Sequence, residues 1–130
     1  MKDISINASG KAELTVSESD LASNVRSGSL RVFATPTMIM LMEKAACNCL
    51  ADCLEGDETT VGTEMNVKHV SATPCGMQVR AEAQLTAVDG RCFTFSVKAY
   101  DEAGLIGEGT HQRFLVFGER FTQKAEAKLK

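Results

Sequence analysis

One long apolar segment followed by a series of alternating segments constrains the fold of this chain most. Thr35 and Pro36 begin a predicted helix, because Thr is a good N-cap and Pro loses no hydrogen bond at the first helical position. The helix is predicted to extend to about Leu54, with Gly56 closing it just beyond the end. No second helix of this length is expected, so this one has to cover any sheet that forms.

Five segments alternate apolar and polar residues, as half-buried strands do. A sheet built from them is polar on one face, and its apolar face must curl around the helix. The sequence therefore predicts an α+β fold, an antiparallel sheet wrapped around one long central helix. The polar residues 17–34 form a long connection, of a length that is often functional. The predicted strands are Lys11–Val16, Gly62–Ala72, Met77–Val88, Cys92–Tyr100 and Leu105–Phe117.

The turn near Asp89 and Gly90 allows a prediction of strand register. A two-residue turn would set Leu85 opposite Thr94, pairing a core side chain with a solvent one. A three-residue turn, Val88 to Gly90 with Gly90 left-handed, pairs odd positions with odd positions instead. We therefore predict the three-residue turn.

Length and composition bound the classes of protein that this chain can be. Its 130 residues predict one domain, residues 1–130, with poorly ordered tails at 1–10 and 122–130. A net charge of −3 disfavours nucleic-acid binding, which needs a basic patch. No apolar stretch is long enough to span a membrane, and the first residues lack an apolar leader. We expect a cytoplasmic protein that binds neither membrane nor nucleic acid.

The five cysteines do not form a recognisable metal-binding pattern. Cys47, Cys49 and Cys53 lie together in the predicted helix, and both histidines lie far away in strand-like segments. A zinc site would lack its second half. We therefore predict no metal, and we predict buried, reduced thiols.

Glu43 is the carboxylate that the predicted helix places on its apolar face. At about 100° per residue, it lies far from the polar stripe that contains Lys44, Asn48 and Asp52. A charge buried there needs a partner or a raised pKa, and a carboxyl of raised pKa suits acid–base chemistry near neutral pH. The alternative is a structural Glu that bends to solvent or pairs with Lys or Arg.

Three other residues are candidates on weaker grounds. His69 shares the core face of its strand with Met65 and Val67, and it is either a structural core histidine or part of a site with Thr35 or Glu43. Thr35 is explained by capping alone, although a hydroxyl at a helix N-terminus would also favour a developing negative charge. Arg113, on one face with His111, either forms a surface ion pair or binds substrate.

Several short motifs together resemble the hot-dog-fold thioesterases of the fluoroacetyl-CoA thioesterase type. They occur in the order and spacing of that family over residues 30–121, and the combination is specific although each motif alone is weak. The motifs are Val32–Ile39 with Leu41-Met42-Glu43, Val61-Gly62-Thr63, His69 with Ala72-Thr73-Pro74 and Gly76, Val88-Asp89-Gly90-Arg91, and Gly109-Thr110-His111-Gln112-Arg113.

The resemblance implies a hot-dog fold and a homodimer with active sites at the subunit interface, with a tetramer as a further possible assembly. It places the catalytic residues of the family on Thr35, Glu43 and His69, its backbone contact on Gly62 and its strand arginine on Arg113. No cofactor is implied beyond the coenzyme A of the substrate.

One segment departs from the family pattern. Bulky aromatic residues in the lid before the helix carry fluoroacetyl specificity in that family, whereas Arg26-Ser27-Gly28-Ser29-Leu30 has no aromatic residue before Phe33. The resemblance therefore implies hydrolysis of an acyl-CoA with an unassigned acyl group. Glu43 would act as general base or as nucleophile, and the sequence does not choose between them. The alternatives are an acyl-CoA-binding domain without turnover and a hydratase or isomerase, which would need a second acidic residue on a core face.

Overall fold

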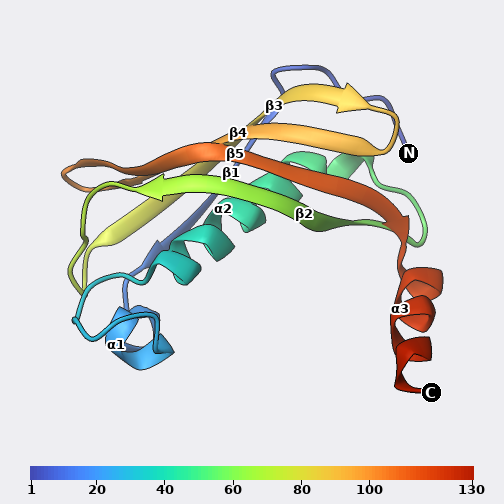
Figure 1. Ribbon diagram of the computed structural model, residues 1–130. Helices are drawn as coiled ribbons and strands as arrows, with labels where there is room; N and C mark the ends of the chain where they lie inside the picture. Colours follow the sequence, from blue (N-terminus) through green and yellow to red (C-terminus); the bar gives the residue numbers. More distant parts are fainter.

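The computed structural model describes residues 1–130 and contains a five-stranded antiparallel sheet curled over one long helix, α2 (Figure 1). The strand order is β1-β3-β4-β5-β2, so β1 and β2 form the two edges. This is the α+β arrangement that the sequence predicts. The elements are β1 (Ser9–Thr15), α1 (Ala22–Val25), α2 (Thr35–Leu50), β2 (Glu58–His69), β3 (Gln78–Asp89), β4 (Cys92–Asp101), β5 (Gly104–Phe117) and α3 (Gly118–Glu126).

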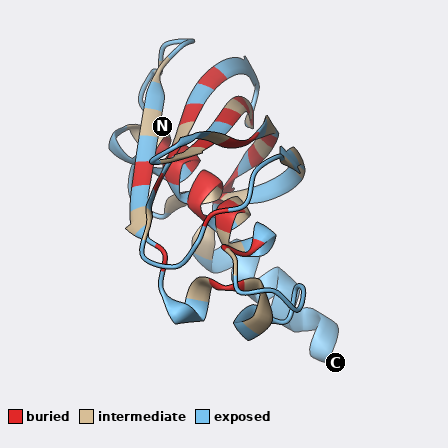
Figure 2. Cartoon of the chain, turned by 90° about the vertical axis from the view of Figure 1, so that its left-hand side faces the viewer, coloured by how far each residue is buried: buried red, intermediate tan, exposed pale blue.

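Helix α2 lies on the concave face of the sheet and supplies much of the core. Its buried residues recur at the three- and four-residue spacing of one helical face, which is why this segment is a helix that packs rather than a solvated one. Figure 2 shows the buried residues gathered between α2 and the sheet. The fully buried members on α2 are Met38, Leu41, Met42, Ala45, Ala46 and Leu50.

Helix α2 differs from the sequence prediction at both of its ends. The N-cap is Ala34, and the Thr35 side chain makes no capping bond, because its hydroxyl contacts His69 instead. The α-helix ends at Leu50, and a 3₁₀ turn, Ala51–Cys53, continues toward the predicted end at Leu54. Gly56 has a φ of 55°, the left-handed conformation expected of a residue after a helix.

The edge strand β2 is less well covered than the other half of the sheet. Helix α2 packs mainly against β1 and β3 and contacts β2 only sparsely. Met65, Val67 and His69 share one face of β2, as predicted, but each is only half-buried. The concave face beside β2 therefore has apolar surface that this chain alone does not cover.

The predicted three-residue turn is wrong. Asp89 pairs with Cys92, so Gly90 and Arg91 form a two-residue turn in which Gly90 has a φ of 61°. Leu85 nevertheless pairs with Phe95, as expected for two core residues. The register shifts between Leu85 and Ala87, so a β-bulge inside the strand restores the pairing that we assigned to the turn.

The chain outside the main elements is also described. The connection 17–34 contains a 3₁₀ turn and the four-residue helix α1. Poor order of residues 1–10 and 122–130 stays a prediction; in the structure, residues 9–10 belong to β1 and residues 122–126 to α3, a helix that we did not predict. The N-terminal ammonium of Met1 donates to Glu58 Oε2 at 2.9 Å. No helix is long and apolar enough to cross a membrane.

All five cysteines are free, but the expectation that they are buried is wrong. Cys47 and Cys75 are exposed, and Cys49, Cys53 and Cys92 are half-buried. The methionines differ along α2, since Met38 and Met42 are buried whereas Met40 is exposed. One face of α2 therefore carries Met40 and Cys47 at its surface.

Candidate active site

Thr35 and His69 form a hydroxyl–imidazole pair at the start of α2. Thr35 Oγ1 lies 2.7 Å from His69 Nδ1, which joins the first turn of α2 to the last residue of β2. His69 Nε2 is buried and has no hydrogen-bond partner. Burial lowers the pKa of His69, so its imidazole is held in the neutral form. A neutral ring with one fixed and one free nitrogen can pass a proton to or from a substrate.

A cavity of about 270 Å³ lies against this pair. It is bounded by the connection before α2 and by the segment that follows β2. The N-terminal turn of α2 borders it, and helix N-termini favour negative charge. The structure therefore brings Thr35 and His69, two of the site residues predicted from sequence, together beside one cavity. The lining residues are Ala22, Ser27, Val32, Phe33, Thr35, His69, Val70, Ser71 and Ala72.

Glu43 lies in a different environment, two turns farther along α2. Its Oε2 accepts a hydrogen bond from Arg113 Nη1 at 3.1 Å. The Glu43 side chain is 41% exposed and that of Arg113 only 7%. Glu43 is thus a partly exposed carboxylate held by a nearly buried guanidinium, not the unpaired buried charge that its place on the helix face suggests.

Arg113 is fixed on several sides. Its Nε donates to Thr60 Oγ1 at 2.9 Å and its Nη2 to the Thr60 carbonyl at 3.0 Å. Its Nη1 lies 3.2 Å from His111 Nε2, while His111 Nδ1 lies 2.8 Å from the Glu64 carbonyl. Because a carbonyl only accepts, Nδ1 carries the proton and Nε2 accepts from Arg113. This network excludes the alternative that Arg113 forms a surface ion pair.

The absence of a side chain at Gly62 leaves space for the Glu43 carboxylate. A Cβ at this position would lie 2.7 Å from Glu43 Oε2 and 3.3 Å from His111 Cε1, so any larger residue would displace the carboxylate. A β-bulge between Gly62 and Glu64 turns Gly62 toward α2. A second cavity, of about 250 Å³, lies here and is lined by Ile39, Glu43, Gly62, Thr63, Glu64, Met65 and His111.

The five site residues predicted from sequence fall into two groups within one chain. Thr35 and His69 form one, and Glu43, Gly62 and Arg113 form the other. Thr35 and Glu43 are eight residues apart on one helix, about 12 Å along its axis at 1.5 Å per residue. A single chain therefore does not bring Glu43 into contact with the Thr35–His69 pair.

The sequence analysis noted His111 beside Arg113 without giving it a role, and it missed Thr60. His111 is fully buried and Thr60 nearly so, and both bond to Arg113. His111 could have been included in the site, because it alternates with Arg113 on one face of a strand. Thr60 could not, because the bulge after it reverses the alternation that the later residues of β2 show.

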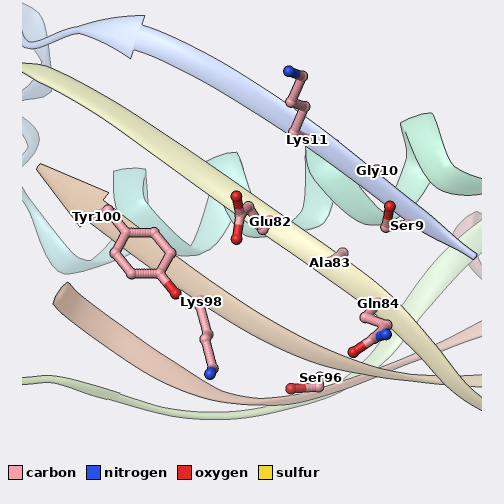
Figure 3. Close-up of a pocket in the computed structure, with 9 residues that line it drawn as sticks. All are labelled: Ser9, Gly10, Lys11, Glu82, Ala83, Gln84, Ser96, Lys98 and Tyr100. Atoms are coloured by element: carbon pink, nitrogen blue, oxygen red, sulfur yellow. The ribbon is translucent and has the colours of Figure 1, made fainter. Parts of the chain in front are cut away.

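A larger cavity, of about 540 Å³, lies elsewhere. It is a hollow on the outer face of the sheet across β1, β3 and β4, and Figure 3 shows its polar side chains. Lys11 and Lys98 are both cross-strand neighbours of Glu82, so opposite charges account for this surface. None of the predicted site residues lines it.

Comparison with known proteins places this arrangement in a family. The family model of fluoroacetyl-CoA-specific thioesterases matches residues 16–119. A fluoroacetyl-CoA thioesterase from Streptantibioticus cattleyicolor is 41% identical over 97 residues, which cover 75% of this chain and 70% of that protein.

Solved structures agree with the sequence matches. A structure of the fluoroacetyl-CoA thioesterase superposes with a TM-score of 0.93 and 31% identity over 98% of both chains. A thioesterase-superfamily protein from Thermus thermophilus superposes with a TM-score of 0.90 and 25% identity, over 99% of this chain and 98% of that one. The predicted resemblance and the hot-dog fold are both confirmed: this chain belongs to the family of fluoroacetyl-CoA-specific thioesterases.

Proposed function

We propose that this protein hydrolyses an acyl-CoA thioester to a free acid and coenzyme A, in a homodimer whose two active sites each draw on both subunits. The family match supports the thioester chemistry. The observation that carries the proposal is the Thr35–His69 pair, a neutral imidazole with a free nitrogen beside a cavity at a helix N-terminus.

A two-fold axis accounts for the separation of Glu43 from that pair. Pairing of two β2 edges in one continuous sheet makes the strands antiparallel, so the start of one β2 lies beside the end of the other. The two α2 helices then also run antiparallel. With the axis near Ile39, midway between residues 35 and 43, Glu43 of one subunit faces Thr35 and His69 of the other.

Two features of the single chain support this dimer. The concave face beside β2 is poorly covered by its own α2, and Met65, Val67 and the exposed Met40 lie on the uncovered side. The edge of β2 is also long, and such edges invite pairing with another chain. A partner α2 and β2 would cover both.

In the proposed reaction, water adds to the thioester carbonyl carbon and the carbon–sulfur bond breaks. Glu43 takes a proton from the water, or attacks the carbonyl itself to form an anhydride that water then opens. Thr35 and the N-terminal turn of α2 stabilise the oxyanion. His69 accepts the proton released by the attacking water, directly or through Glu43, and passes it to the departing thiolate of coenzyme A, so the ring ends neutral again. Arg113 and Gly62 position Glu43 and need not touch the substrate.

The proposed acyl group is one other than fluoroacetyl. In this chain the connection before α2 has no aromatic residue before Phe33, and Phe33 is fully buried in the core. A screen of thiol release over short, branched, aryl and long acyl-CoAs identifies the preferred substrate. Tight acyl-CoA binding with no thiol release from any of them would favour the binding domain without turnover. A cytoplasmic location and assembly beyond the dimer stay predictions.

Complementation between inactive variants tests the shared site directly. Thr35→Ala and Glu43→Gln homodimers should each retain about 1% of the wild-type turnover or less. In a purified heterodimer of the two, one site carries both changes and the other carries neither, so about half of the wild-type turnover should return. If Thr35 and Glu43 worked within one chain, every site of the heterodimer would be defective. An inactive heterodimer therefore contradicts the shared site.

A further inference from the structure

Helix α3 is a nine-residue helix with no buried residue and few contacts to the rest of the chain. It extends from the end of β5 away from the sheet, on the same side as α2 (Figure 1). None of its residues is buried, and Figure 2 shows the segment that ends at the C-terminus as exposed throughout. An isolated helix shorter than about 12 to 15 residues is marginal in water. A nine-residue helix with no buried side chain therefore needs cover from outside the chain.

The start of α3 is nevertheless fixed in direction. Asp57, in the loop before β2, accepts a hydrogen bond from the Glu119 amide at its Oδ2 and from the Gly118 amide at its carbonyl, each at 3.0 Å. A carboxylate at this position also favours the helix dipole. The helix is thus anchored beside the first residue of β2 and directed away from its own domain.

One side of α3 is suited to packing. Phe121 and Ala125 of α3 and Leu129 of the 3₁₀ turn that follows it (Ala127–Leu129) recur every fourth residue and form a stripe, and the Leu129 side chain is 89% exposed. At the other end of the molecule, Leu30 is 68% and Val70 56% exposed, and Val25 is also exposed. Val70 lines the cavity beside Thr35 and His69. Each chain therefore presents an apolar stripe at one end of the sheet and an apolar patch at the other.

We propose that α3 of one subunit docks on this patch of the partner subunit and closes one side of the partner's Thr35–His69 cavity. The inference rests on the proposed dimer. Because the two β2 strands run antiparallel there, the start of one β2, where α3 is anchored, lies beside the end of the other, where His69 lies.

Hydrogen exchange tests the docking without any need for turnover. In the intact dimer, amides of residues 118–129 should exchange at least about tenfold more slowly than in Phe121→Glu. Gln123→Lys is the control, since it adds a charged side chain to α3 outside the stripe, still donates to Glu119 four residues earlier and should leave protection unchanged. Residues 21–34 and 70–74 should lose protection together with α3 in Phe121→Glu. Exchange of α3 at the unprotected rate in the wild-type dimer, or a monomeric wild type, would overturn the proposal.

Two heterodimers decide whether α3 serves its own site or that of its partner. When a Thr35→Ala/Phe121→Glu chain is paired with a wild-type chain, the surviving site has Thr35 from the wild-type chain and α3 from the altered one. Its KM should rise about fivefold or more, as in the Phe121→Glu homodimer, because a wall of the cavity is lost. When Thr35→Ala is paired with Phe121→Glu, the surviving site has an intact α3 and a wild-type KM.

The reverse pattern would mean that α3 acts within its own chain and would overturn the proposal. The two readouts also separate this inference from the proposed function. Protection of α3 without thiol release from any acyl-CoA refutes hydrolysis and leaves the docking standing. Thiol release with an unprotected α3 refutes the docking and leaves the hydrolysis standing.

Discussion

The two ends of the candidate site hold their reactive groups in opposite ways. At the start of α2, Thr35 and His69 hold only each other, and the second ring nitrogen is left without a partner. In the middle of α2, Glu43 is tied to Arg113, which is tied in turn to Thr60 and His111. The first group is open to a ligand, whereas the second is a charged network that fixes one carboxylate. The difference indicates that Glu43 needs exact placement, while Thr35 and His69 need access.

Among the variants of the two groups, Glu43→Gln should cause the largest loss of activity. The amide keeps the shape and can still accept from Arg113, but it is neither a base nor a nucleophile. We expect kcat for thiol release to fall by about 10³-fold with the fold intact. Glu43→Asp, which keeps the charge on a shorter stem, should lose less. A Gln variant that retains most of its kcat over the acyl-CoA panel would remove Glu43 from the reaction.

Thr35→Ala tests the open group. Loss of the hydroxyl removes both the contact to His69 Nδ1 and one group facing the oxyanion, and we expect about a 10²-fold fall in kcat. Thr35→Ser restores the hydroxyl and should recover most of the rate. Because Thr35 makes no capping bond, thermal unfolding should change little in either variant. Equal rates in the Ala and Ser variants would show that the hydroxyl plays no part.

Gly62→Ala tests the fixed group without altering any polar atom. The new Cβ would lie 2.7 Å from Glu43 Oε2, so the carboxylate has to move. We expect kcat to fall about tenfold with little change in KM, since only the position of Glu43 is affected. Gly28→Ala is the control, because its Cβ would lie 3.5 Å from Ala22, an ordinary contact. Wild-type kcat in Gly62→Ala would show that the close approach of this glycine is not needed.

The sequence predicted the elements of the fold well and the contacts between them less well. Alternation and helical spacing are local, so the five strands and α2 could be placed within a few residues. The bulges near Thr86 and Thr63 are not local, because they depend on which strand lies beside them. The bulge near Thr86 is the reason that the turn was predicted with the wrong length. The bulge near Thr63 is the reason that Thr60 was not predicted to face the core. α3 was missed because its short amphipathic pattern has no partner in the chain.

The candidate site shows the same limit. Each predicted residue was found from its type and its face, and the structure supplies the grouping that the sequence could not. On the helix alone, Glu43 looked like a buried charge without a partner. Arg113 is 70 residues away in sequence, and only the pairing of β5 with β2 brings it beneath α2. The distance between Thr35 and Glu43, in contrast, follows from helix geometry alone.

The smallest predicted effect concerns His111 and the pH dependence of stability. Burial first, and the Arg113 charge after it, lower the pKa of His111, while its bond to the Glu64 carbonyl and the Glu43 charge act in the opposite direction. The folded state therefore takes up this proton at a lower pH than the unfolded state, where the pKa is about 6.5. As pH falls below about 6.5, the unfolded state binds more protons and the free energy of unfolding decreases.

His111→Asn should weaken that dependence, because Asn keeps a donor for the Glu64 carbonyl but does not titrate. Urea unfolding between about pH 5.5 and 7.5, where carboxylates remain ionised, should show a shallower loss of stability on acidification than in wild type. His69→Gln should also reduce the slope, since burial lowers the pKa of His69 too. If His111→Asn kept the full wild-type slope, protonation of His111 would not contribute to the pH dependence of stability. The imidazole would then not be held neutral beside Arg113, and the contrast between the two ends of the site would weaken.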